Sequence, residues 1–113
     1  MDVFGAGGQL IKRLVSHGSL NSPWGLSLAG PNFGTFANAL LVGNFGNGRI
    51  NAYNFKTGAF LGQLQNAISK PLVIDGLWTI TFGNQKAPLN TLFFSAGPDQ
   101  ESHGLFGKLQ PVP

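Results

Sequence analysis

Cysteine is absent from this 113-residue chain, so neither a disulfide nor a thiolate metal site is available to it. Charged residues make up only 10% of the sequence, against roughly 25% in a typical soluble domain. No apolar run approaches the roughly 18 residues that a membrane-spanning helix needs. The first residues, Met1–Phe4, have neither the basic start nor the apolar stretch of a signal peptide. We therefore expect no membrane partner, and the cellular compartment stays open.

Glycine and phenylalanine are abundant instead. The chain has 17 glycines and ten phenylalanines, a composition typical of tight turns between short, buried strands. The formal net charge is +3, and it arises mainly because acidic residues are scarce. Apart from Lys12-Arg13 the basic residues are scattered singly, so we expect no nucleic-acid partner.

The sequence reads twice, with a period of 52 residues. Asn38–Asn44 recurs as Asn90–Ala96, and Leu26–Leu28 falls on Trp78–Ile80. A period of this length, with short β-rich runs and Gly-rich turns, is typical of β-propeller blades. Because two blades cannot close a ring, the repeat predicts that the chain has partners.

Runs of β-forming residues bounded by Gly, Pro and Asn predict eight strands. They cover residues 9–15, 24–29, 39–45, 49–55, 59–65, 77–82, 91–96 and 104–109. Asn47-Gly48 and Lys56–Gly58 predict tight hairpin turns, and Gly30–Gly34 and Gly83–Pro88 predict longer loops. No segment shows a sustained helical period, so the expected fold class is all-β.

The eight strands predict two four-stranded blades in a circularly permuted arrangement. Residues 9–65 form the first repeat, with a displaced outer strand at 9–15, and residues 66–113 form the second, which lacks a fourth strand of its own. An unpaired edge invites pairing with another chain, so strand 9–15 is expected to complete the second blade of a neighbour. Such head-to-tail contacts can close into a ring. A homotrimer with six blades fits best, and a four-bladed dimer and an eight-bladed tetramer are the alternatives.

Several motifs spread over nearly the whole chain resemble one known family. They are Asn21–Ala29, Leu41–Tyr53, Thr57–Gly62, Ile74–Trp78, Ser95–Asp99 and His103–Gly107. These motifs resemble a family of uncharacterised bacterial NHL-like six-bladed β-propellers, mostly exported and some with a PEP-CTERM sorting tail. The chain is similar to the C-terminal third of those proteins. The resemblance implies a propeller fold and an exported parent protein, and it implies no settled function.

Two polar residues, Asn21 and Asp75, precede the strands predicted to be innermost. In a propeller that position opens onto the central channel, where three-fold repetition would gather three amides and three carboxylates. Oxygen ligands of this kind suit a hard divalent cation, Ca²⁺ first. Metal-dependent hydrolases on six-bladed propellers bind their metal in that region, an analogy at the level of fold alone. The alternative is that Asp75 caps the turn before its strand.

The densest polar cluster comprises Asp99, Glu101 and His103, within five residues on one predicted loop. His103 is a candidate general base at neutral pH, with a carboxylate to orient it. The three side chains are also candidate metal ligands. An ordinary charged surface loop is the alternative, because no complete metal or nucleophile motif accompanies the cluster.

Four further residues are candidate ligand-binding groups. Trp24 and Trp78 begin innermost strands, where they would either stack on a sugar or pack between blades. Asn44 and Arg49 would either line a polar pocket or serve hairpin and strand-edge roles.

Three functions follow from these patterns. The first is an oligomeric propeller that serves as a binding scaffold with a polar central channel. The second is a metal-dependent hydrolase of lactonase or phosphotriesterase type, and the third is a lectin-like glycan binder. The expected partners are other copies of the chain and a small molecule or glycan.

Overall fold

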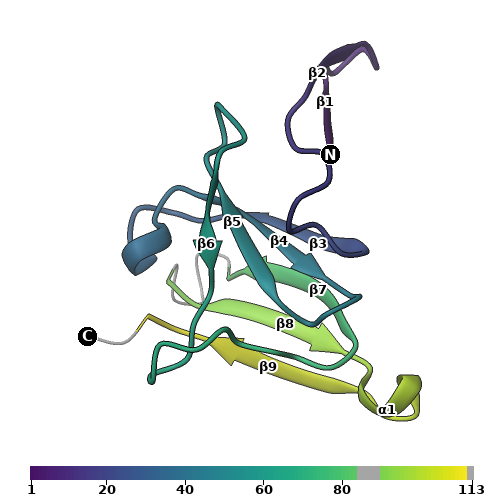
Figure 1. Cartoon of the computed structure of the whole chain (residues 1–113), viewed down its shortest axis with the longest axis vertical. Helices are drawn as coiled ribbons and strands as arrows, with labels where there is room; N and C mark the ends of the chain where they lie inside the picture. Colours follow the sequence, from purple (N-terminus) through teal and green to yellow (C-terminus); the bar gives the residue numbers. More distant parts are fainter. Residues whose placement is uncertain (84–89, 112–113) are drawn as a thin grey trace.

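The computed structural model describes residues 1–83 and 90–111, which contain nine β-strands and two short helical turns (Figure 1). The strands are β1 (Asp2–Phe4), β2 (Leu10–Arg13), β3 (Pro23–Leu28), β4 (Leu40–Asn44), β5 (Ile50–Tyr53), β6 (Phe60–Gln63), β7 (Leu77–Phe82), β8 (Leu92–Ala96) and β9 (Leu105–Leu109). The helical turns are η1 (Gly34–Phe36) and α1 (Pro98–Glu101). The predicted all-β class is confirmed. Among the described residues, no helix is long and apolar enough to cross a membrane.

Each of the eight predicted segments coincides with one strand, and the ends differ by at most two residues. Both predicted hairpin turns form, with Gly48 and Gly58 at φ angles of 71° and 76° that favour glycine. The loop predicted at Gly83–Pro88 lies outside the described residues from position 84 onward. Among the strands of residues 1–83 and 90–111, β1 alone was not predicted from the sequence pattern.

The strands form three antiparallel sheets, none of them closed. β3, β4, β5 and β6 form the first sheet in that order, and β7, β8 and β9 form the second sheet. β1 and β2 form a separate hairpin. In both large sheets every strand pairs with the next strand along the chain.

The strand register shows how the two large sheets correspond. Leu26 pairs with Val42 in the first sheet, and Ile80 pairs with Phe94 in the second. Val42 and Phe94 stand 52 positions apart on equivalent central strands, so Leu26 corresponds to Ile80, at an offset of 54. The sequence-based match of Leu26 to Trp78 is therefore wrong by two residues.

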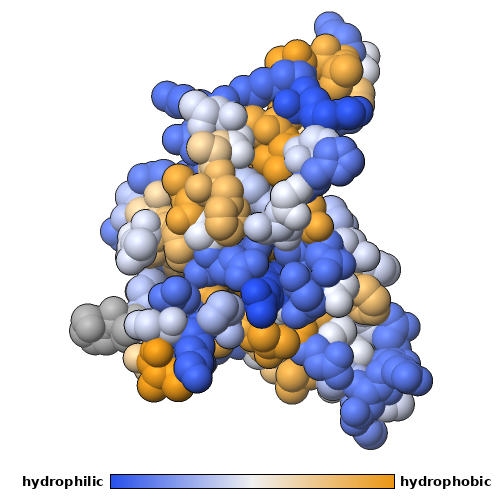
Figure 2. Space-filling view, viewed as in Figure 1, coloured by the Kyte–Doolittle hydropathy of each residue, from blue (hydrophilic) through white to orange (hydrophobic). Residues whose placement is uncertain are grey.

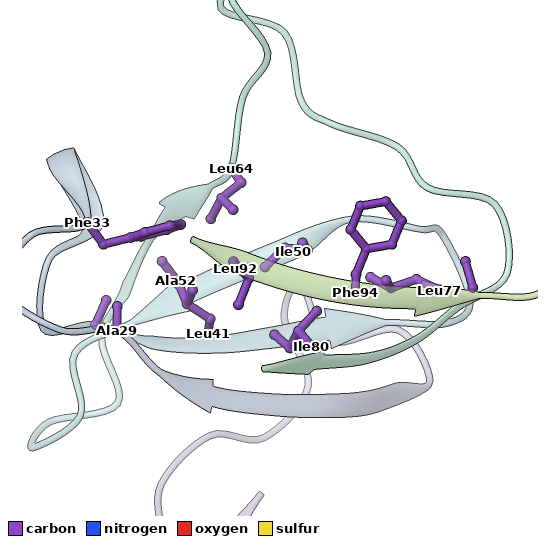
Figure 3. Packing of buried hydrophobic residues seen from close by; sticks show 12 residues of the cluster. Ala29, Phe33, Leu41, Ile50, Ala52, Leu64, Leu77, Ile80, Leu92 and Phe94 are labelled. Carbon is purple, nitrogen blue, oxygen red and sulfur yellow. The ribbon is translucent and has the colours of Figure 1, made fainter. Parts of the chain in front are cut away.

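The two large sheets pack face to face around the main hydrophobic core. Figure 3 shows Leu41 and Ile50 of the first sheet directed toward Ile80 and Leu92 of the second, and all four are almost fully buried. β3 and β7 approach each other closely at Gly25. A Cβ atom there would lie only 2.9 Å from the amide nitrogen of Ile80, so the close approach requires glycine.

A smaller core lies on the other face of the first sheet. Val15, from the segment that leads into β3, packs on Leu40, Val42 and Tyr53. Leu20 adds further apolar contact from the same segment. The N-terminal part of the chain therefore covers the central strands of this face.

The β1–β2 hairpin projects away from the sheets (Figure 1), and Figure 2 shows apolar atoms on it. Phe4, Leu10 and Ile11 are each more than half exposed. Arg13 Nε donates to Asp2 Oδ1 at 2.9 Å, and this bond lowers the pKa of the Asp2 carboxyl and raises the pKa of Arg13. Strand 9–15 was expected to lack a partner in its own chain, and β1 is that partner.

Candidate functional site

Most of the candidate residues lie at one end of the two large sheets. The segments that enter β3 and β7 meet the β4–β5 turn there: Gly46 N donates to Asn21 O at 3.1 Å, and Ile74 N donates to Gly48 O at 2.8 Å. The second bond joins the two sheets at this end. We call this end the loop face, which comprises residues 19–24, 44–49, 74–78 and 97–104.

Buried amide side chains organise the first half of the loop face. Asn44 Oδ1 accepts from Asn21 N, and Asn44 Nδ2 donates to Ser19 O, both at 3.1 Å. Asn51 Nδ2 donates to the same carbonyl at 2.7 Å and to Tyr53 Oη at 3.0 Å. Burial raises the pKa of Tyr53, and the bond from Asn51 opposes that rise. Asn44 is fully buried, so in this structure it fastens the segment entering β3.

Arg49 extends this network to the outer strand. Its Nη1 donates to Gln63 Oε1 at 3.3 Å, and Gln63 Nε2 donates to Asn51 Oδ1 at 2.9 Å. The backbone amide of Arg49 also donates to Asn47 Oδ1 at 3.1 Å, which fixes the β4–β5 turn. The half-buried guanidinium therefore connects the turn with β6.

Asp75 braces the second half of the loop face. Its Oδ2 accepts a hydrogen bond from Asp99 N at 3.0 Å. Asp99, Gln100 and Glu101 all have positive φ angles, of 53°, 55° and 67°, so α1 is largely a left-handed turn. That conformation costs roughly 1–2 kcal/mol for each such residue. The hydrogen bond that Asp99 N donates to Asp75 is one contact that helps to hold the turn in place.

Trp78 lies beneath this turn. A Cβ atom at Gly97 would overlap the indole ring, so the glycine is needed for the ring to rest on the backbone. Trp78 Nε1 donates to Glu101 Oε1 at 3.3 Å. Trp78 is half-buried as a result, and the Glu101 carboxylate is already engaged as an acceptor.

His103 stands at the exposed edge of the same connection. Its Nε2 lies 3.9 Å from Asp99 Oδ2, and both side chains are exposed. The structure thus gathers Asp75, Asp99, Glu101 and His103 around one connection, whereas the sequence suggested two separate sites. Within residues 1–83 and 90–111, no group of three or more His, Asp or Glu side chains is arranged to hold a metal ion.

Trp24 differs from Trp78 because it is open to solvent. Trp24 is 64% exposed, and its ring centroid lies 5.7 Å from that of Phe45 in a tilted arrangement. Neither Phe45 nor Gly97 was predicted from the sequence as part of a site. A lone aromatic within the Gly-rich turn Gly43–Gly48 and a glycine directly after a buried strand are the signals that would have identified them.

Comparisons with known proteins find distant viral relatives. The chain is 35% identical over 109 residues to uncharacterized protein L690 of Acanthamoeba polyphaga mimivirus, and 34% identical over 109 residues to uncharacterized protein R648 of the same virus. Each alignment covers 96% of this chain, but the chain spans only 28% and 26% of the lengths of these relatives. No protein-family model matches the chain. No solved structure matches it.

Proposed function

We propose that this chain is a two-blade unit of a β-propeller and that three copies form a six-bladed ring that serves as a binding scaffold. The observation that carries the proposal is the face-to-face packing of two sequential antiparallel sheets with β3 and β7 side by side. Propeller blades are four-stranded sheets arranged around a central channel. In the ring, β3 and β7 line a polar channel and the loop face surrounds its mouth. The resemblance to NHL-like propellers supports this arrangement.

The outer edge of β9 supports the assembly of several copies. Among the described residues no strand pairs with that edge, and a groove of about 640 Å³ lies between β6 and the end of β9. Leu14 follows β2 as Leu64 follows β6, and each then leads into a first strand, which supports a role for β2 as a fourth strand. We infer that β2 of one copy adds to β9 of its neighbour and completes the second blade.

The hydrogen bonds of the loop face favour binding over metal-assisted hydrolysis. Asp75 and Glu101 each hold a neighbouring group, and these bonds stabilise the β8–β9 connection. The hydrolase alternative places a divalent cation such as Ca²⁺ at Asp75 and Asn21, with His103 as base. In that alternative Asp75 Oδ1 would bind the cation while Oδ2 keeps its bond to the Asp99 amide.

A glycan-binding function has one observation in its favour. Trp24 presents an exposed ring at the loop face next to Phe45, and exposed aromatic faces stack on sugars. This is the second candidate function.

Two measurements test the scaffold. Light scattering of the full chain should give the mass of three copies, and a monomer at micromolar concentration would contradict the ring. Ester and lactone substrates should show no turnover that a chelator removes. Asp75→Asn is the matched variant, because it keeps an oxygen acceptor for Asp99 N while it removes the charge.

The other outcomes of these assays separate the candidates. Chelator-sensitive turnover that is lost in Asp75→Asn would replace the scaffold with the hydrolase. Polysaccharide binding that is followed by tryptophan fluorescence and lost in Trp24→Ala would establish the glycan binder instead.

A further inference from the structure

Each large sheet has one face against the other sheet and one face turned away, and the repeat relates these faces. Ile80 and Leu92 lie on the covered face of the second sheet. Their counterparts in the first sheet, Leu26 and Leu40, occupy the same register positions. Gly25 faces the second sheet, and successive side chains alternate along a strand, so Leu26 points away from the second sheet. Leu40 lies in the smaller core on that same outer face.

On the face turned away from the second sheet, the first sheet leaves exposed an apolar position whose counterpart in the second sheet is buried. Ile80 is 2% exposed, whereas its counterpart Leu26 is 57% exposed. Leu28, on the same side of β3, is 52% exposed. Residues 14–20 already cover the central strands of this face, so the uncovered part follows β3. We call the row formed by Trp24, Leu26 and Leu28 the open face of the first sheet.

The second sheet has a matching open face. Phe93 and Phe106 lie on it, with their rings stacked at a centroid distance of 5.8 Å. Their counterparts in the first sheet are Leu41 and Ile50, both fully buried against the second sheet. Phe106 is 73% exposed. Phe106 is thus exposed to solvent at the position where its counterpart in the first sheet, Ile50, is buried in the core.

We propose that the open face of the first sheet binds the open face of the second sheet of another copy of this chain. The contact between molecules would repeat the contact that the two sheets make within one molecule. This inference rests on the proposed ring and assigns the surfaces that build it. Each copy offers both surfaces, so the contact is head-to-tail and propagates from copy to copy.

The contact within one molecule predicts the pairs between molecules. A Cβ atom at Gly43 would lie 3.6 Å from Ile80 Cγ2, so these two positions touch across the core. The counterpart of Gly43 is Ser95, and the counterpart of Ile80 is Leu26. Ser95 of one copy should therefore contact Leu26 of the next. Ser95 is small, which leaves room for the leucine.

One charged residue shares the open face of the second sheet. Lys108 pairs with Phe93 across β8 and β9, and its counterpart in the first sheet is the buried Ala52. β9 is the outermost strand of the second sheet among the described residues. In the proposed ring β2 of a neighbour would lie beside β9, and the long lysine side chain can extend past that strand to keep its ammonium group in water. The apolar contact should therefore centre on Ser95 and Phe106, which pair at the part of this face away from Lys108.

Disulfide cross-linking tests the predicted pair directly, because the chain contains no cysteine. Leu26→Cys and Ser95→Cys are made as two single variants and mixed under mild oxidation. We expect disulfide-linked heterodimers in the mixture and little self-linking of either variant. Efficient self-linking of Leu26→Cys would show that like faces pair, and it would overturn the proposal. Thr57→Cys, on the exposed β5–β6 turn, measures the background rate.

A second variant pair keeps the test independent of cross-linking geometry. Leu26→Glu should weaken self-association at least about thirty-fold, because the carboxylate would be buried without a partner. The thermal unfolding midpoint of the single copy should change little, since Leu26 is exposed there. Ile68→Glu is the matched control, at an exposed apolar residue outside both open faces, and it should leave association unchanged.

The proposed ring and the proposed contact can fail separately. A three-copy mass without mixed cross-links, or with equal effects of Leu26→Glu and Ile68→Glu, would overturn the contact and leave the ring standing. A monomeric mass would overturn both. Chelator-sensitive turnover with mixed cross-links would overturn the scaffold function and leave the contact standing.

Discussion

The two large sheets fill equivalent positions with opposite chemistry. In the first sheet Val42 pairs with Asn51, and the asparagine is buried and hydrogen-bonded. In the second sheet the corresponding pair is Phe94 and Gly107. The Phe94 ring lies over the glycine so closely that a Cβ atom there would overlap it. One site is held by polar bonds and the other by an aromatic ring.

The difference follows from what each pair faces. Phe94 points into the core between the sheets, where a large ring and a glycine pack without a void. Val42 faces the N-terminal segment, and Asn51 holds that segment through Ser19 O. The same strand pattern therefore accepts two kinds of cover, which are another sheet or the segment that enters the sheet.

A substitution that forces the two sheets apart should cause the largest loss of stability. In Gly25→Ala the new Cβ would lie 2.9 Å from backbone atoms of Trp78 and Ile80, and backbone cannot move aside as a side chain can. We expect the free energy of unfolding to fall by about 3 kcal/mol. Urea denaturation followed by circular dichroism measures the loss.

Gly30→Ala is the control for this substitution. No atom lies within 4 Å of a Cβ built at Gly30, so we expect a change within about 0.5 kcal/mol. Equal effects of the two substitutions would mean that the close approach of β3 and β7 does not limit stability.

Loss of the hydrogen bonds that Asn51 makes beneath residues 14–20 should cause the next largest loss of stability. Asn51→Ala removes the donor to Tyr53 Oη and the acceptor for Gln63 Nε2. We expect a loss of about 2 kcal/mol, because buried polar groups then lack partners. Amide hydrogen exchange should rise in residues 14–20 more than in β7–β9. The exposed Asn32 gives the matched control, Asn32→Ala, which should change little. Equal exchange increases in both regions would contradict the role of Asn51 in holding residues 14–20 on the first sheet.

The sequence predicted the strands well because each one ends at its own turn residues. Asn47-Gly48 and Lys56–Gly58 fix two hairpins by local backbone geometry, and local geometry is visible in a sequence. β1 escaped because it is only three residues long. The Gly5–Gly8 run between apolar residues is the signal that would have revealed its hairpin.

The candidate site was predicted only as a set of residues. The positions of Asp75 and Asp99–His103 were identified, but the two partners of the Asp75–Asp99 bond lie 24 positions apart in the sequence. The left-handed turn at Asp99–Glu101 was not predicted, because no glycine or asparagine marks those positive φ angles. The two-residue change of offset between inner and central strands became visible only in the cross-strand register.

Alkaline pH should weaken the packing of residues 14–20 on the first sheet, and this effect should be smaller than those of Gly25→Ala and Asn51→Ala. Burial raises the pKa of Tyr53 above its ordinary value of 10.0, so the folded chain keeps the phenol protonated to higher pH than the unfolded chain does. The resulting contribution to stability is complete below about pH 10 and is lost as the pH rises through the folded-state pKa. Tyr53 is the single tyrosine of the chain, so phenolate absorbance reports its ionisation directly.

The corresponding residue of the second sheet, Leu109, does not ionise, so the two regions should respond differently. Amide exchange at residues 14–20 should accelerate as the phenolate forms, before exchange in β7–β9 does. In Tyr53→Phe the pH dependence at residues 14–20 should flatten, because the ring still packs on Val15 and Leu40 but carries no proton to lose. An unchanged alkaline response in Tyr53→Phe would assign that response to the lysines. Ionisation of Tyr53 would then not control how residues 14–20 pack on the first sheet.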